Sequence, residues 1–206
     1  MQSRNHWDQV YREKQPDRVS WYQPRADLSL QWILAAAPPP HAAIIDAGGG
    51  ASTLVDSLLD AGYSRLTVLD LAPEALAISQ ARLGDRAPAV EWLTGDLTRT
   101  ALPAGAYDVW HDRAVFHFLT TADERAAYLE TAQRSVKPGG HLIAATFADD
   151  GPQQCSGLPV VRYSAAALQA EFEPFFAPLA HRQEEHRTPS GTLQRFSYCL
   201  FRRKAS

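Results

Sequence analysis

Two acidic residues and a glycine cluster are the features of this 206-residue chain whose types and spacing could bind a nucleotide. The apolar run 42–45 leads into Asp46, and glycines at 48–50 precede apolar residues at helical spacing. Strand, tight turn and helix in that order open a nucleotide-binding α/β unit, and glycine lets a ligand approach the backbone of the turn. A second apolar run, 66–69, ends at Asp70, whose carboxylate could accept both hydroxyls of a ribose. The pattern predicts an adenosine-containing cofactor.

The glycine spacing distinguishes two classes of cofactor. A dinucleotide fingerprint requires a third glycine where this chain has Thr53. The D-x-G-x-G-x-S segment that begins at Asp46 instead resembles the first motif of class I S-adenosylmethionine (SAM)-dependent methyltransferases, with Ser52 replacing the last glycine. The resemblance implies that SAM is the cofactor and that Asp46 helps to hold its methionine end. The cofactor-binding residues implied in this region are Asp46, Gly48, Gly50, Ser52, Asp70 and Leu71.

Later motifs follow in the order of the same family. The segment 90–97 resembles a third strand that closes on Gly-Asp-Leu, the loop that holds adenine in the family. The segment 107–113 resembles the fourth-strand motif, and 136–143 resembles the turn before the fifth strand. The resemblance implies that an acidic side chain accepts a hydrogen bond from the adenine amine while an apolar neighbour packs on the ring. The further cofactor residues that it implies are Asp96, Leu97 and Asp112.

Hydrophobic periodicity and capping residues predict the elements that position these motifs. Predicted helices are 5–14, one capped by Asp27, one that opens at Pro73 and runs to 83, one from the capping box at Thr121 to about 136, and one capped by Ser164 over 165–175. Two strands, 179–187 and 193–203, flank a glycine-containing loop and predict an antiparallel hairpin. The expected fold is α/β: a Rossmann-like, seven-stranded, mostly parallel sheet with helices on both faces and a C-terminal antiparallel hairpin. Such a hairpin is typical of the methyltransferase variant of the fold and not of a dehydrogenase.

Aromatic residues are dense near the N-terminus. The segments from Trp7 to Tyr11 and from Ser20 to Tyr22 resemble the W-D-x-V-Y … S-W-Y opening of a methyltransferase subgroup that includes elongation-factor lysine methyltransferases. The resemblance implies that residues 1–40 form a helical lid over a SAM-binding domain at 41–206, within one globular unit. Aromatic faces attract a sulfonium cation and a lid excludes water, so Trp21 and Tyr22 are predicted cofactor contacts. The alternative is that these rings simply pack on the sheet.

The reacting groups are less clearly marked. His117 lies in the loop that borders the methyl group in this family and is a candidate base or substrate contact, with a core histidine as the alternative. A metal site at His111 and Asp112 is not expected, because successive residues of a strand face opposite sides. Nitrogen, oxygen, sulfur and carbon acceptors all remain open. A small-molecule acceptor is favoured because no recognition domain is inserted; the alternatives are a protein lysine and a SAM-binding sensor without catalysis.

Composition limits the partners and the compartment. The formal net charge of −3 argues against binding nucleic acid or an anionic membrane. The apolar run 28–37 stops at three prolines and is too short to span a bilayer, and the first residues lack a signal-peptide pattern. Cys155 and Cys199 show no metal-ligand spacing. A cytoplasmic protein with reduced cysteines is therefore expected.

Overall fold

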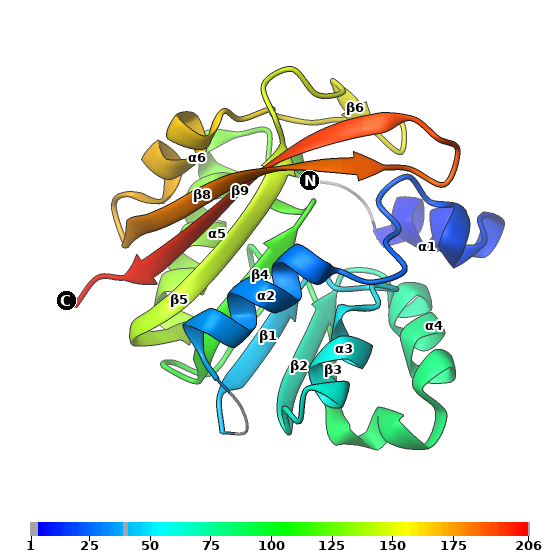
Figure 1. The fold of residues 1–206 in the computed structure, drawn as a ribbon, viewed down its shortest axis with the longest axis horizontal. Coiled ribbons are helices and arrows are strands. Elements are labelled where there is room, and N and C mark those ends of the chain that lie inside the picture. The colour runs from blue at the N-terminus through cyan, green and yellow to red at the C-terminus, as the bar shows by residue number, and fades with distance from the viewer. Residues whose placement is uncertain (1–3, 39–40, 206) are drawn as a thin grey trace.

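A seven-stranded sheet runs through the centre of the computed structural model, which describes residues 4–38 and 41–205 (Figure 1). The strand order is β3-β2-β1-β4-β5-β9-β8, with β1 to β5 parallel and β9 antiparallel to both of its neighbours. The strands are β1 (Ala43–Ala47), β2 (Arg65–Asp70), β3 (Val90–Thr94), β4 (Tyr107–Arg113), β5 (Val136–Phe147), β8 (Phe176–Arg187) and β9 (Leu193–Arg203). The predicted fold with its C-terminal hairpin is confirmed. A separate small pair, β6 (Gln154–Cys155) and β7 (Leu158–Pro159), was not predicted.

Helices cover both faces of the sheet because successive strand residues point to opposite sides. Ile44 of β1 packs in a core with α2, α3 and α4, whereas Ile45 packs in a second core with α5 and α6. The helices are α1 (Arg4–Glu13), α2 (Asp27–Ala36), α3 (Leu54–Asp60), α4 (Pro73–Leu83), α5 (Ala122–Ser135) and α6 (Ala165–Phe172), with 3-10 turns η1 (Pro16–Arg18), η2 (Gly84–Ala89) and η3 (Phe116–Phe118). Within the described ranges, no helix has both the length and the apolar character needed to cross a membrane.

Most helix starts follow the sequence signals, and three boundaries do not. Thr121 forms the predicted capping box and Ser164 the predicted cap. The prediction for Asp27 is wrong: Ala26 occupies the cap position, and Asp27 lies in the first turn, where its charge favours the helix N-terminus. The helix predicted to reach 175 ends at Phe172, and the strand predicted from 179 begins at Phe176. Proline is tolerated inside this strand because β8 is an edge strand with a register shift there.

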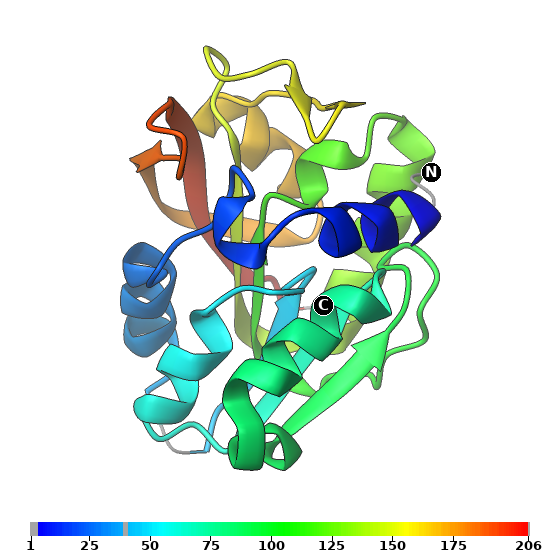
Figure 2. The same ribbon diagram turned by 90° about the vertical axis from the view of Figure 1, so that its right-hand side faces the viewer.

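The N-terminal residues divide between the body of the fold and the top of the sheet. Helix α2 belongs to the body, since Ile33 is fully buried in the core beside Ile44. Helix α1 lies outside that layer and packs on α4 (Figure 2). Arg12 pairs there with Glu74. The aromatic residues of the predicted lid that line the pockets, Trp7, Tyr11, Trp21 and Tyr22, all precede α2.

Candidate functional site

The loop between β1 and α3 runs so close to its neighbours that glycine is required. Gly48 has φ +75°, and a Cβ there would overlap the side chain of Val115. Gly50 has φ +45°, and a Cβ there would lie 2.8 Å from Oδ2 of Asp70. The Ser52 hydroxyl accepts the N–H of Leu54 at 3.1 Å and so begins α3. The loop leaves its backbone open at the carboxyl ends of β1 and β4, where the strand order reverses and ligands bind in such sheets.

The acidic residues that follow β2 and β3 both present a carboxylate oxygen to the main pocket. Asp70 Oδ1 accepts the N–H of Ala72 at 2.8 Å, and burial, reinforced by the negative Asp46, raises the pKa of Asp70 to about 7. Asp96 Oδ1 accepts the N–H and the hydroxyl of Thr98 at 2.9 and 2.7 Å. Its Oδ2 is buried and has no hydrogen-bond partner among the described residues. A buried carboxylate oxygen of this kind requires a donor, which a ligand can supply.

Asp46 lies at the end of β1 and lines a smaller adjoining pocket. Its Oδ1 is 2.7 Å from Nδ1 of His111, and Nε2 of His111 is 2.8 Å from the hydroxyl of Ser29. Oδ2 of Asp46 is buried with no partner in the described part of the chain. Gly48, Ser52 and Tyr22 line the same pocket. The arrangement fixes the carboxylate by one oxygen and leaves the other for a donor.

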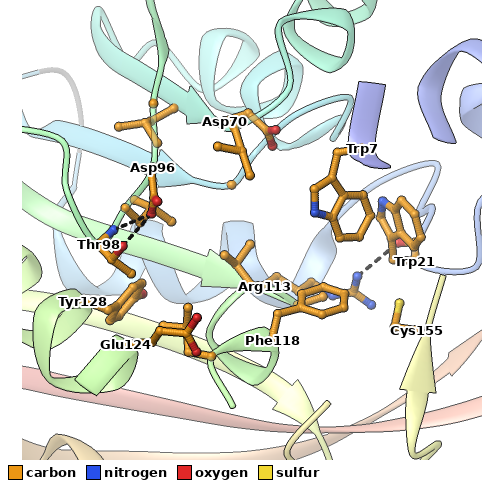
Figure 3. Close-up of a pocket in the computed structure, with 18 of the residues that line it drawn as sticks. Trp7, Trp21, Asp70, Asp96, Thr98, Arg113, Phe118, Glu124, Tyr128 and Cys155 are labelled. Atoms are coloured by element: carbon orange, nitrogen blue, oxygen red, sulfur yellow. Dashed lines mark hydrogen bonds between the residues drawn. The ribbon is translucent and has the colours of Figure 1, made fainter. Parts of the chain in front are cut away.

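The main pocket has a polar end and an aromatic end (Figure 3). About 970 Å3 of space lies between its lining residues, with the open solvent at its mouth included. Asp96, Thr98, Glu124 and Tyr128 lie at the polar end, with Leu71 and Leu97 also in the lining. What we call the aromatic end consists of Trp7, Trp21, Arg113, Phe118 and Cys155.

The aromatic end is built from distant parts of the chain. Trp7 of α1 packs edge-on against Phe118 of η3, with ring centroids 5.1 Å apart, and against Trp21 at 5.8 Å. Trp21 also meets Tyr11 edge-on at 6.3 Å. The rings therefore pack on one another and also line the cavity, and the contact of Trp21 and Tyr22 with the cofactor stays a prediction.

Comparisons with known proteins point in the same direction as this geometry. A family described as "Methyltransferase domain" matches residues 45–144. The eEF1A lysine and N-terminal methyltransferase of Danio rerio is 24% identical over 151 residues, which cover 72% of this chain and 22% of that protein. A ubiquinone/menaquinone biosynthesis C-methyltransferase of Methylobacterium nodulans is 28% identical over 105 residues, which cover 50% of this chain and 40% of that protein. The chain spans less than half the length of these curated relatives.

A solved structure extends the likeness to nearly the whole fold. It is the 1,6-didemethyltoxoflavin-N1-methyltransferase of Burkholderia thailandensis with bound 1,6-didemethyltoxoflavin and S-adenosylhomocysteine (SAH). The TM-score is 0.73 at 18% identity, and the match covers 98% of this chain and 87% of that one. The chain thus matches a methyltransferase domain over residues 45–144 and shares the fold of a SAM-dependent methyltransferase.

The residues of this methyltransferase domain fit SAM as its cofactor. Positively charged or N–H-bearing parts of SAM can satisfy the unpartnered oxygens of Asp46 and Asp96, and the ribose hydroxyls can donate to Asp70. The glycine loop leaves room that a Cβ would fill. The residues predicted to bind the cofactor that line one or both pockets are nine: Trp21, Tyr22, Asp46, Gly48, Ser52, Asp70, Leu71, Asp96 and Leu97. Gly50 is not in the lining but packs directly on Asp70.

Asp112 does not reach the cofactor pocket of the methyltransferase, contrary to the prediction. Its side chain is fully buried on the face opposite His111. It accepts the N–H groups of Val115 and Phe116 and, at 2.6 Å, the hydroxyl of Tyr128. Burial raises the pKa of Asp112 to about 6. Both oxygens of the Asp112 carboxylate already accept hydrogen bonds from Tyr128 or from the turn after β4. Asp112 therefore positions that turn instead of contacting the cofactor.

His117 likewise lies inside the fold and is absent from the lining of both described pockets. Its Nδ1 accepts the N–H of Phe147 at 3.3 Å, and burial lowers the pKa of the imidazole to about 3. A neutral ring enclosed by Phe118 and Phe147 has no path to a substrate proton. The structure favours the core-histidine alternative. No His, Cys, Asp or Glu cluster suited to a metal occurs within 4–38 and 41–205.

The sequence reasoning missed several residues of the pocket lining. Arg113 and Cys155 lie at the aromatic end, and Thr98, Glu124 and Tyr128 at the polar end. One signal was available for Arg113, because a charged residue that ends a strand as buried as β4 requires partners inside the protein. Cys155 carried no such signal, since the β6–β7 segment that presents it was not predicted.

Proposed function

We propose that the protein transfers a methyl group from SAM to a small-molecule acceptor through a nitrogen, oxygen or sulfur nucleophile. The observation that carries this proposal is the cover over the aromatic end of the pocket. Trp7 and Trp21 from the N-terminal segment and Cys155 from the β6–β7 segment meet there over Phe118. A pocket roofed from two sides suits a compact acceptor that enters whole.

The chain's own residues bind, align and exclude water. SAM, when bound, supplies a methyl group that is already activated. Asp46, Asp70 and Asp96 hold its polar parts at three separate strand ends, which fixes its orientation. Alignment of two reactants can supply roughly 7–11 kcal/mol of a reaction barrier, so no single catalytic side chain is required. Residues 4–22 act in this proposal as the lid that closes the site, which narrows the predicted segment of 1–40.

The second candidate acceptor is a protein lysine. Its support is the set of aromatic faces at the pocket end, since such faces attract an ammonium or sulfonium cation. The Danio rerio relative, described as a lysine and N-terminal methyltransferase, matches over part of its length only. The small-molecule acceptor remains preferred because the lid residues occupy the surface that a protein substrate would have to approach.

Incubation of the purified protein with tritiated SAM and an extract of the source cells tests this proposal. The products are separated by size, and we expect label in the small-molecule fraction. The Asp70→Asn variant is the matched control and should lower the signal without loss of fold. Label on protein instead would establish the lysine alternative, and label in neither fraction, with SAM binding verified by calorimetry, would indicate a sensor.

We further propose that the protein acts in the cytoplasm, without nucleic-acid or membrane partners. Cys155 and Cys199 are buried free thiols, which is usual for a reducing compartment. The net charge of −3 offers no excess of basic residues for phosphates.

A further inference from the structure

Among the described residues that line the main pocket, Arg113 is the one with a positive charge. Its guanidinium is held in place by a ring contact and three hydrogen bonds. Its side chain is 9% exposed and lies over the Phe196 ring, 4.2 Å from the centroid. Nε donates to the Tyr198 hydroxyl at 2.8 Å, Nη1 to the Trp21 carbonyl at 3.0 Å, and Nη2 to Glu184 at 3.2 Å. A guanidinium carries five N–H groups, so two have no acceptor within the described residues. These donors belong to a buried charge at the aromatic end of the pocket.

The Glu184 carboxylate does not saturate this cation. Its Oε2 engages one N–H of Arg113, while Oε1 accepts the side-chain amide of Gln23 at 3.0 Å. The remaining acceptors of Arg113 are a neutral hydroxyl and a carbonyl. A second carboxylate or another anion could therefore bind to the free N–H groups, and guanidinium favours such charge-assisted contacts.

The aromatic end offers nothing to an ammonium group beyond its ring faces. Its titratable neighbours are Cys155, whose thiol pKa burial raises to about 11, and Tyr11, whose pKa burial raises well above its ordinary value, so both groups stay neutral at pH 7. The carboxylates of Asp96 and Glu124 lie at the opposite end of the pocket, and that of Asp70, also in the lining, is assigned above to the ribose of the cofactor (Figure 3). An amine acceptor must lose a proton before it can attack, and no described side chain at the aromatic end is placed to take it. An ammonium ion would also face the like charge of Arg113.

We propose that the methyl acceptor carries an anionic group, a carboxylate or a thiolate, that pairs with the free N–H groups of Arg113. This inference rests on the proposed function and specifies its substrate class. Arg113 acts as a specificity-determining residue that selects anions, while Trp7, Trp21 and Phe118 pack against the apolar part of the acceptor. The assignment also disfavours lysine as the acceptor.

Benzoate and benzylamine test the inference, because they share a ring and differ in the sign of their charge. Each is titrated by calorimetry into protein saturated with SAH. We expect benzoate to bind at least about tenfold more tightly than benzylamine, in line with a charge-assisted pair. Tighter binding of benzylamine, or equal binding of the two, would overturn the proposal.

Two variants with opposite expected effects sharpen the test. Arg113→Met should keep SAH affinity within about threefold and lose at least about tenfold in benzoate affinity. Glu184→Gln removes the competing charge and should strengthen benzoate binding severalfold, which keeps the test decisive if the Arg113 variant misfolds. A fall in SAH binding that matches the fall in benzoate binding in folded Arg113→Met would mean that Arg113 holds the cofactor. The tritium assay decides separately whether a small molecule is methylated at all.

Discussion

Cofactor affinity should depend on pH through Asp70. Burial raises the pKa of this carboxyl group to about 7 in the cofactor-free protein, and the ionised form is the better acceptor for two ribose hydroxyls. Affinity is therefore present above pH 7 and is lost as the pH falls through that value. With a pKa of about 7, the ionised fraction falls about tenfold between pH 8 and pH 6, so the SAM dissociation constant should rise by about the same factor.

Calorimetry with SAM at pH 6, 7 and 8 measures this slope. Asp70→Asn should weaken binding at pH 8 and abolish the slope, whereas Asp96→Asn should weaken binding and keep it. Asp70→Asn, which should weaken SAM binding, should by contrast stabilise the cofactor-free fold. The pKa of Asp70 is higher in the folded state than in the unfolded chain, so the free energy of unfolding of the cofactor-free protein falls as the pH rises from about 4 to 7 and stays lowered above pH 7. Asp70→Asn should therefore unfold at a higher temperature than the wild type at pH 8. A wild-type affinity that does not change from pH 6 to pH 8, or a slope that survives in Asp70→Asn, would refute the reasoning.

Three further perturbations test the glycine loop, the turn after β4 and the lid. Gly48→Ala should abolish SAM binding in calorimetry, because the Cβ overlaps a neighbouring side chain at positive φ, while Gly62→Ala, with φ +89° and open space around it, should cost only about 1 kcal/mol and retain binding. Tyr128→Phe should lower the free energy of unfolding by about 1–3 kcal/mol, since the buried Asp112 loses its 2.6 Å donor; chemical denaturation measures this, and an unchanged midpoint would contradict it. Limited proteolysis between residues 4 and 25 should slow when SAM is added, and equal rates would argue against closure of the lid over the cofactor.

Features encoded in the backbone could be predicted from the sequence. The glycine loop, the capping box at Thr121 and the terminal hairpin each rest on local residue types, and each is present in the structure. Local patterns also placed Asp70 and Asp96 at adjacent strand ends, because parallel strands bring their carboxyl ends to one edge. The subgroup suggested by the N-terminal aromatics stays a prediction, since spacing alone does not identify a substrate.

The turn after β4 shows why two site residues were misplaced. Ala114 adopts φ +66°, a left-handed conformation that alanine rarely takes and that no sequence signal indicates. This turn brings the N–H groups of Val115 and Phe116 onto Asp112, and it directs His117 into the interior beside Phe147. A motif fixes the order of residues along the chain, whereas a single unexpected backbone angle decides which of them face the ligand.

Asp46 in the smaller pocket and Arg113 in the main pocket are joined by a chain of buried hydrogen bonds that no local pattern could reveal. Asp46 is 2.7 Å from His111, His111 is 2.8 Å from Ser29, Ser29 is 3.3 Å from the hydroxyl of Tyr198, and Tyr198 accepts from Arg113 at 2.8 Å. The members come from α2, β1, β4 and β9, so the chain forms only when the helix and these three strands are in place. Buried polar groups are costly when unpaired, and each member therefore fixes the next. The acid proposed for the cofactor and the cation proposed for the acceptor thus belong to one buried network, in which each is held by its immediate neighbour, Asp46 by His111 and Arg113 by Tyr198.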